Sequence, residues 1–516
     1  MDRFQAVSPL DFRYYGGEKS IFSKLQPFVS ENASIKYQCR VEAALVETFA
    51  DLALCSRGVA DEVTNASREV AAAEVYELDK VLHHTSKALV EAIRGKVSPE
   101  AGRFVHLFAT SFDILDTANA LRYQELAREV LIPDLASLIS TVSRLAREHA
   151  ETVQIGRTHG MHAEPITFGL FLAVYVSRLG RRAIAIEDAR QNLRGKLAGA
   201  VGAHNALALR FPKSAHLVER LFLARLGLLP SETFTSTQIV EPEFVTDFAH
   251  AITSTFSVLA NLADDMRHLH RTEIAEVIEP RGKTGIGSST MPHKTNPKSF
   301  ENIKSLYKAF MPRMITQYLD QTSEHQRDLT NSASGRFTVE LVAAFDYAVV
   351  RMRDTLDRLV IDEKKMRANL DASKAFITAE PLYIVLSLAG VPDAYQKAKD
   401  LASAARERGM SVLELARQDE SLNEALTSLS PKNLEVLEDP AGYIGDAPAR
   451  VHATCDYWEA EMSALLQYLE KEKRALKNPP TRLVKRLAQM IADTEAGKGT
   501  PEQTIPQTRR QMIEEW

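Results

Sequence analysis

Apolar residues recur every three to four positions along most of this chain, which is the spacing of a helix with one buried face. The repeats are clearest in the middle third, in five stretches at 135–146, 167–196, 244–269, 299–320 and 337–359. Most of these stretches exceed the usual helix of roughly 11–12 residues and so predict a long antiparallel bundle. Strand-like alternation is nearly absent. We therefore expect an all-α protein with at most small hairpins near the loops.

Shorter helical stretches flank the middle third. Before it, residues 36–57 and 68–94 have helical spacing, and Ser98-Pro99 starts a further helix. From about residue 362, prolines and glycines break the chain into short helices, and we expect a further helix near 449–475 to pack back on the body. A short helix at 481–495 and a polar tail end the chain. The predicted division is an N-terminal helical domain (1–108), a central bundle domain (109–361), a C-terminal helical domain (362–478) and an extension or tail (479–516).

Composition narrows the class of protein. The chain has 516 residues, of which 45% are hydrophobic and 25% charged, with a net charge of −5. This balance is typical of a soluble protein, and it provides no basic surface for nucleic acid. No apolar run is long enough to cross a membrane, and the first residues lack the apolar run of a signal peptide. Three widely separated cysteines, Cys39, Cys55 and Cys455, fit the reducing cytosol.

The stretch from Arg281 to Ile303 is unlike the helices around it. It holds three glycines within six residues, followed by hydroxyl, imidazole, ammonium and amide side chains. Closely spaced glycines allow the backbone to close tightly on a ligand, and a helical pattern resumes after Pro297. The pattern is typical of a mobile loop that excludes water from a small anionic substrate. It is not a phosphate-binding P-loop, because Val277 stands where that motif needs glycine.

Two further polar stretches interrupt the helical pattern. Residues 156–165 lie between two long helices and contain His159 and His162. A glycine between them and the lack of carboxylate partners make a metal site a weak interpretation, whereas a histidine beside an arginine and a threonine suits proton transfer on an anion. In residues 105–119, Thr110 and Ser111 precede Asp113. They can cap a helix, and they can also bind a carboxylate at its N-terminus.

Together the three stretches resemble the fumarase/aspartase superfamily and, within it, the adenylosuccinate lyase family. The loop matches the superfamily pattern GSSxMPxKxNP without gaps from Gly287 to Pro297. His293 within that pattern is similar to adenylosuccinate lyases and to carboxymuconate cycloisomerases, and the RTHG at 157–160 favours the lyases. The SPLDFRYY at 8–15 is similar to the start of many adenylosuccinate lyases. The resemblance covers roughly residues 7–450.

The resemblance implies an all-α fold of three helical domains, in which four chains pool their long helices in a central bundle. Each active site would then draw segments from three chains of a cytoplasmic homotetramer. The implied reaction is a β-elimination that releases fumarate from adenylosuccinate, giving AMP, and from the succinylated aminoimidazole carboxamide ribotide of purine synthesis. It needs a base, an acid and donors for a doubly charged carboxylate intermediate, with no metal or organic cofactor. The implied partner is a small nucleotide substrate, with no nucleic acid and no membrane.

The resemblance also assigns site residues. Ser288 would be the general base and His159 the general acid, whose ordinary pKa near ~6.5 suits proton donation. The implied substrate-binding residues are, for the succinyl carboxylates, Thr110, Ser111, Thr158, Lys294 and Asn296; for orienting the substrate, Gln238; for the phosphate side, Arg13, Tyr14, Arg327, Ser332 and Arg336; near the nucleotide, His84 and His106; and in the loop, Ser289 and Met291. Thr85 and Phe112 depart from the residues common in the family, so substrate contacts there are open.

Two alternatives accompany this interpretation. The chain could be a carboxymuconate cycloisomerase or another fumarate-releasing lyase, against which His159 and the phosphate-side residues argue. It could also be a non-catalytic structural homologue, although every implied catalytic position is intact. A single arginine or histidine in this set could equally belong to a surface salt bridge or a structural contact.

Overall fold

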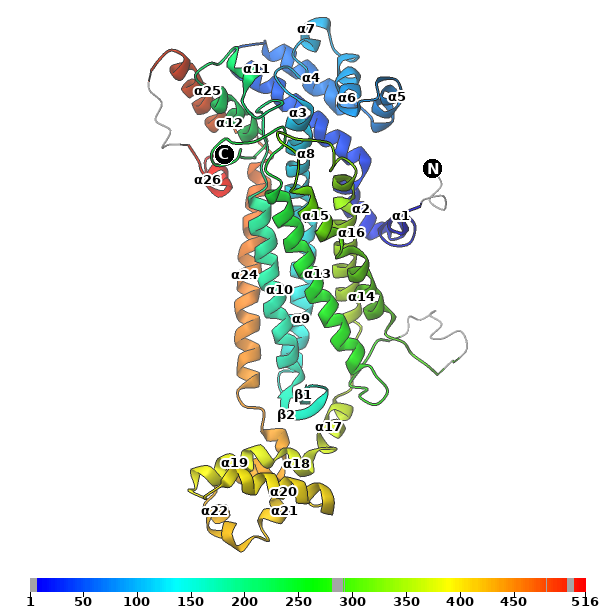
Figure 1. Ribbon diagram of the computed structural model, residues 1–516, viewed down its shortest axis with the longest axis vertical. Helices are drawn as coiled ribbons and strands as arrows, with labels where there is room; N and C mark the ends of the chain where they lie inside the picture. Colours follow the sequence, from blue (N-terminus) through cyan, green and yellow to red (C-terminus); the bar gives the residue numbers. More distant parts are fainter. Residues whose placement is uncertain (1–6, 281–290, 292, 479, 499–504) are drawn as a thin grey trace.

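The computed structural model describes residues 7–280, 291, 293–478, 480–498 and 505–516. The molecule is elongated, with a helical bundle along its long axis and a smaller group of helices at each end (Figure 1). The bundle helices and the short helix α15 beside them are α8 (Ser111–Leu126), α9 (Ile132–Glu148), α10 (Phe168–Gln191), α13 (Glu243–Leu269), α14 (Lys298–Phe310), α15 (Arg313–Asp320), α16 (Thr338–Leu356) and α24 (Ala447–Ala475). The prediction of an all-α protein built on long helices is confirmed.

Strands form only two small sheets in the described part of the chain. Antiparallel β1 (Val153–Thr158) and β2 (Met161–Thr167) make a hairpin at one end of the bundle, and β3 (Val277–Ile278) pairs with β4 (Val360–Ile361). Two predicted helix boundaries need correction. The stretch 167–196 ends its helix at Gln191, and 299–320 divides into α14 and α15 because Pro312 cannot continue the hydrogen bonding of α14.

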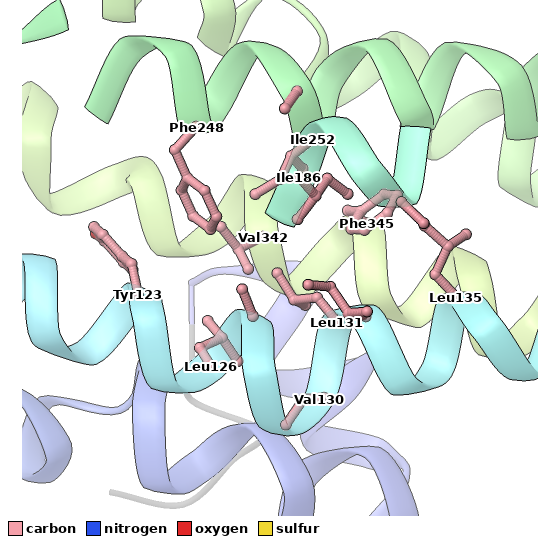
Figure 2. Packing of buried hydrophobic residues seen from close by; sticks show 14 of the residues in the cluster. Tyr123, Leu126, Val130, Leu131, Leu135, Ile186, Phe248, Ile252, Val342 and Phe345 are labelled. Carbon is pink, nitrogen blue, oxygen red and sulfur yellow. The ribbon is translucent and has the colours of Figure 1, made fainter. Parts of the chain in front are cut away.

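The bundle core is one continuous cluster of buried apolar side chains. Figure 2 shows Tyr123 and Leu131, on the α8–α9 side, facing Phe248 of α13 and Phe345 of α16. The rings of Tyr123 and Phe248 stack with their centroids 5.9 Å apart. Fully burying one such side chain contributes about 1.5–3 kcal/mol, so the core residues dominate the stability of the bundle.

The N-terminal helices have a second core of their own, centred on the inner faces of α3, α4 and α6. These helices are α1 (Pro9–Phe12), α2 (Lys19–Val29), α3 (Glu31–Asp51), α4 (Arg57–Glu69), α5 (Ala72–Leu82), α6 (Thr85–Arg94) and α7 (Pro99–Gly102). The helix predicted at 36–57 begins earlier, because the Ser30 side chain caps the start of α3. The stretch 68–94 contains the end of α4 and two further helices, since His83 takes a left-handed conformation that ends α5.

A third core lies at the opposite end of the molecule, in a small group of helices. Its buried residues come from α19 (Ala379–Leu388), α20 (Ala394–Arg408), α21 (Val412–Ala416), the 3₁₀ turn η5 (Glu420–Leu422), α22 (Asn423–Thr427) and α23 (Pro431–Glu438). The remaining helices of the described chain are α11 (Asn205–Ala208), α12 (Ala215–Arg225), α17 (Glu363–Asp371), α18 (Lys374–Ile377), α25 (Thr481–Glu495) and α26 (Arg509–Glu514), with 3₁₀ turns η2 (Tyr15–Gly17), η4 (Ser334–Phe337) and η6 (Pro440–Gly442). From there α24 runs back along α10 and α9 (Figure 1). The division into domains stays a prediction.

The expectation of a polar tail is wrong for residues 505–516. Met512 and Ile513 are buried, and Thr508 caps α26 through a reciprocal hydrogen-bond pair with Gln511. Arg509 is also buried and donates to Glu472 of α24 at 2.6 Å. Polar composition concealed this docking, because the side chain that anchors the segment is itself charged and its partner is on a distant helix.

Asp346, on α16, is a buried acid in the bundle core. It is fully buried, and within the described part of the chain neither carboxyl oxygen has a hydrogen-bond partner. Burial raises the pKa of Asp346 to about 8, and the negative charge of Asp134 adds to this, while Lys24 and Arg353 act in the opposite direction. The folded protein therefore keeps a proton that the unfolded chain, with an ordinary aspartate pKa of ~3.9, releases.

This proton makes the stability of the protein fall as pH rises from about 4 to about 8, by on the order of 1 kcal/mol per pH unit. Below that window both the folded and the unfolded state hold the proton. Above it, the full free-energy cost of ionising the buried Asp346 carboxyl is present. We expect Asp346→Asn to melt at a higher temperature than the wild type at pH 8, with a gap that shrinks at pH 5. Thermal melts at both pH values test this. A gap that is the same at both would contradict it.

Candidate active site

One long helical rod separates the predicted site residues. Helix α8, the π-helical turn η3 (Ala127–Leu131) and α9 follow one another without a break from Ser111 to Glu148. At 1.5 Å per residue this rod is on the order of 50 Å long. Thr110 and Ser111 lie at its upper end in Figure 1, and the β1–β2 hairpin that carries Thr158 and His159 lies beyond its lower end.

Thr110 and Ser111 are held at the start of α8 by a capping box. The Asp113 carboxylate accepts from the Thr110 backbone N–H at 2.8 Å, and the Thr110 side chain accepts from the backbone of Asp113. Asp113 is fully buried and also pairs with Lys196, while the Gly199 N–H lies 3.2 Å from its other oxygen. This buried ion pair fixes the helix start, so the Thr110 backbone position is set by a residue far along the chain.

Arg327 and Gln238 lie beside this helix start. The guanidinium of Arg327 lies over the ring of Phe112 at 6.0 Å, and none of its three nitrogens has a hydrogen-bond partner among the described residues, although all three are buried. The Gln238 N–H donates to the carbonyl of Gln326, next to Arg327, at 3.2 Å. Burial raises the pKa of the nearby Asp116 carboxyl to about 6. A buried, unpaired guanidinium is suited to bind an anionic group.

His106 belongs to the same end of the molecule. Its backbone has a left-handed conformation, and its Nδ1 lies 2.6 Å from a carboxylate oxygen of the fully buried Glu42. Burial by itself would lower the pKa of His106, but the hydrogen bond and the charge of Glu42 outweigh burial, so the pKa is raised. His106 can therefore carry a proton, and a positive charge, at a higher pH than an ordinary histidine.

The hairpin presents His159 at its tip. The turn between β1 and β2 is formed by His159 and Gly160, both in left-handed conformations, and Thr158 pairs with Met161 across it. Thr158, His159 and Met161 are all exposed. The second histidine of the stretch, His162, is bound to Ser373, with 2.6 Å between Nδ1 and Oγ. No group of three side chains able to hold a metal ion is present in the part of the chain that is described.

Lys294 and Asn296 line an open cleft between the end of α13 and the start of α14. The cleft has a volume of about 790 Å³, and its lining is mostly cationic or polar: Arg267, His268, His270, Arg271, Thr272, His293, Lys294, Thr295, Asn296, Pro297 and Glu301. Glu279 caps α14, accepting from the Ser299 N–H at 3.0 Å, and His270 spans from the Glu279 N–H to the Thr295 carbonyl. This basic lining suits a dicarboxylate.

The remaining predicted site residues are scattered. Ser288 and Ser289 lie outside the described residues, and Met291 is exposed beside them in sequence. The Tyr14 hydroxyl lies 3.4 Å from the Asn302 amide of α14, and His84 accepts from the Lys87 N–H as a helix cap. The other residues in this set, all exposed, are Arg13, Ser332 and Arg336. Of the two departures noted in the sequence, Phe112 supports Arg327 and Thr85 begins α6.

Family models and known proteins match most of this chain. A family model described as Lyase matches residues 19–310, and one described as Adenylosuccinate lyase C-terminal matches residues 323–434. The chain is 35% identical over 461 residues to adenylosuccinate lyase of Pyrococcus abyssi, which covers 88% of this chain and 98% of that protein. The chain belongs to the adenylosuccinate lyase family. As a member of this family it is a carbon–nitrogen lyase.

Other relatives of the family are consistent with this membership. Adenylosuccinate lyase of Aquifex aeolicus is 33% identical over 418 residues, covering 80% of this chain and 92% of that protein. Among solved structures, the 3-carboxy-cis,cis-muconate lactonizing enzyme of Pseudomonas putida superposes with a TM-score of 0.73 over 89% of this chain and 100% of that one, at 24% identity. At that identity the superposition shows a shared fold, whereas the lyases are more similar in sequence.

For this member of the adenylosuccinate lyase family, sequence reasoning missed the residues that hold the site in place. Glu42, which holds His106, and Lys196, which holds Asp113, lie in stretches with ordinary helical or polar patterns. Glu276, which binds the hairpin, is one of several acidic residues before the loop. The sequence signal that existed was weak: a charged residue on an otherwise apolar face usually needs a buried partner.

Proposed function

We propose that this protein cleaves adenylosuccinate to AMP and fumarate, and the succinylated aminoimidazole carboxamide ribotide to its amide and fumarate. In this proposal His159 protonates the leaving nitrogen and Ser288 removes the carbon-bound proton. Lys294 and Asn296 bind the succinyl carboxylates, with Thr110, Ser111 and Thr158. Family membership supports the reaction, and the basic cleft around Lys294 supports a dicarboxylate substrate.

The α8–α9 rod separates Arg327 from His159 within one chain. Arg327, beside Phe112 at the start of the rod, and His159, in the hairpin that follows its other end, are on the order of 50 Å apart in one chain, far more than the length of a nucleotide. One substrate can touch both only if they come from different chains. We therefore propose a homotetramer whose active sites combine segments of neighbouring chains, with the cytosol as its location.

Each of the three separated segments has side chains suited to a different part of the reaction. The Arg327 end has an unpaired buried cation and a helix N-terminus, which suit the phosphate and a carboxylate. The Lys294 cleft adds cations that stabilise the second negative charge of the carbanion intermediate. His159, on an exposed hairpin tip, can enter a neighbouring chain's site without unfolding its own surroundings.

Turnover of candidate substrates tests the proposed function. Adenylosuccinate and the succinylated ribotide are each mixed with the purified protein, and ultraviolet absorbance follows the loss of the succinyl adduct. We expect both substrates to be cleaved, with one fumarate released for each substrate molecule consumed. If neither is cleaved while another succinyl adduct or carboxymuconate is consumed, the substrate assignment is wrong. If no substrate reacts, the non-catalytic alternative is favoured.

A further inference from the structure

Glu276 lies just before β3 and is fully buried. Its carboxylate accepts four hydrogen bonds from three side chains: Arg157 Nη2 at 2.6 Å and Nη1 at 3.3 Å, Gln154 Nε2 at 2.7 Å, and Asn369 Nδ2 at 2.8 Å. Its backbone is tied down as well, since its N–H donates to the Leu269 carbonyl. A buried carboxylate with this many donors is held in one orientation.

The donors show what Glu276 holds. Gln154 and Arg157 both belong to β1, and Asn369 belongs to α17, which packs against β1. Arg157 is the second residue before His159, so the last side chain anchored to the protein body stands next to the exposed tip. Gly156, just before it, has no room for a side chain, since a Cβ there would lie 2.6 Å from the Glu164 carbonyl of β2. The direction of the tip is thus set by the residues directly before it.

We propose that Glu276 is a positioning residue for His159: through Arg157 and Gln154 it fixes the hairpin so that the imidazole reaches the substrate in a neighbouring chain. The inference rests on the proposed role of His159 as the acid. A displacement of about 1 Å at a reacting group can cost on the order of 10²-fold in rate, so a residue remote from the substrate can control kcat.

Glu276 also balances charge at the hairpin. The desolvation of His162 and the positive charge of Arg157 lower the pKa of His162, and the negative charge of Glu276 opposes this shift, so both charges act within the hairpin. Other titratable or charged side chains at the hairpin include His149 just after α9, Glu164 of β2, Glu363 of α17 and Glu380 of α19. Without the Glu276 carboxylate, Arg157 would lose its ion-pair partner at the hairpin.

The test compares Glu276→Gln with the wild type in the intact enzyme. We expect kcat to fall by at least about tenfold with KM within about twofold, because every proposed substrate-binding group except Thr158 lies outside the hairpin. Glu276→Asp, which keeps the charge on a shorter side chain, should recover part of kcat.

Asp134→Asn is the matched control, because Asp134 of α9 is also a buried carboxylate in an ion pair, with Lys24 of α2 at 2.7 Å. It should lower the melting temperature, while kcat per folded tetramer stays near that of the wild type. His159→Ala is measured in parallel, so that an unaffected His159→Ala refutes the acid assignment, and an inactive His159→Ala with unchanged Glu276→Gln refutes only this inference. A loss of kcat that disappears when activity is expressed per folded tetramer would also overturn it. If Glu276→Gln does not fold, the same measurements on Glu276→Asp decide.

Discussion

Replacing His159 with alanine is expected to lower kcat for adenylosuccinate by about 10²–10⁴-fold, the usual contribution of a positioned general acid. The leaving nitrogen would then depart without a proton donor. Because the side chain is exposed at a hairpin tip, its removal leaves no cavity in the core, and the melting temperature should stay within a few degrees of the wild type. Steady-state ultraviolet assays and thermal melts measure the two quantities. Ser288→Ala should have an effect of similar size if Ser288 is the base.

The control for this experiment is Met161→Leu on the same turn. Met161 is 70% exposed and pairs with Thr158, so the substitution perturbs the hairpin tip without touching the imidazole. It should retain most of the activity. A His159→Ala variant with a rate near that of the wild type would refute the acid assignment. A large loss in both variants would instead show that the tip must keep its shape, whatever group it carries.

Mixing two inactive variants is expected to restore activity, and this is the second large effect. His159→Ala and Arg327→Ala remove groups near opposite ends of the α8–α9 rod. If each site takes these groups from different chains, random mixing in equal amounts leaves about one quarter of the sites with both groups intact. The variants are co-expressed with different affinity tags, mixed tetramers are isolated, and their specific activity is compared with that of each parent.

A second mixture provides the matched control. Gln238→Ala and Arg327→Ala remove groups that one chain brings together, since the Gln238 N–H donates to the residue before Arg327. Every chain in that mixture carries one defect in the same region of its fold. No complete site can then form, and no activity should return. Recovery in the control mixture, or none in the first mixture, would refute a site shared between chains in this way.

The relation between the variants also separates positioning from chemistry. Glu276→Gln should combine with His159→Ala without a further loss of kcat, because Glu276 acts only through the hairpin that carries His159. Lys196, by contrast, holds Asp113 at the start of α8, where Thr110 and Ser111 lie. The two buried carboxylates, Glu276 and Asp113, therefore hold different segments of the proposed site, near opposite ends of the α8–α9 rod.

The sequence by itself determined the helical class, the long helices and the three polar stretches of the proposed site. These features depend on local information. Apolar spacing of three and four residues specifies which face of a helix is buried, and the loop motif is contiguous from Gly287 to Pro297. The ends of the helices were less predictable, because a cap such as Ser30 or a break such as Pro312 competes with neighbouring positions that look equally suitable.

The tertiary structure decided what holds these stretches and how far apart they lie. Arg157 and Glu276 are 119 residues apart in sequence, and Arg509 binds Glu472 on another helix, so no local pattern indicates either pair. Such partners are chosen by the packing of the helices, which brings a buried charge within reach of one opposite charge and excludes water from both. We propose that Ser288 and His159 meet only in the tetramer, where neighbouring chains bring their segments together.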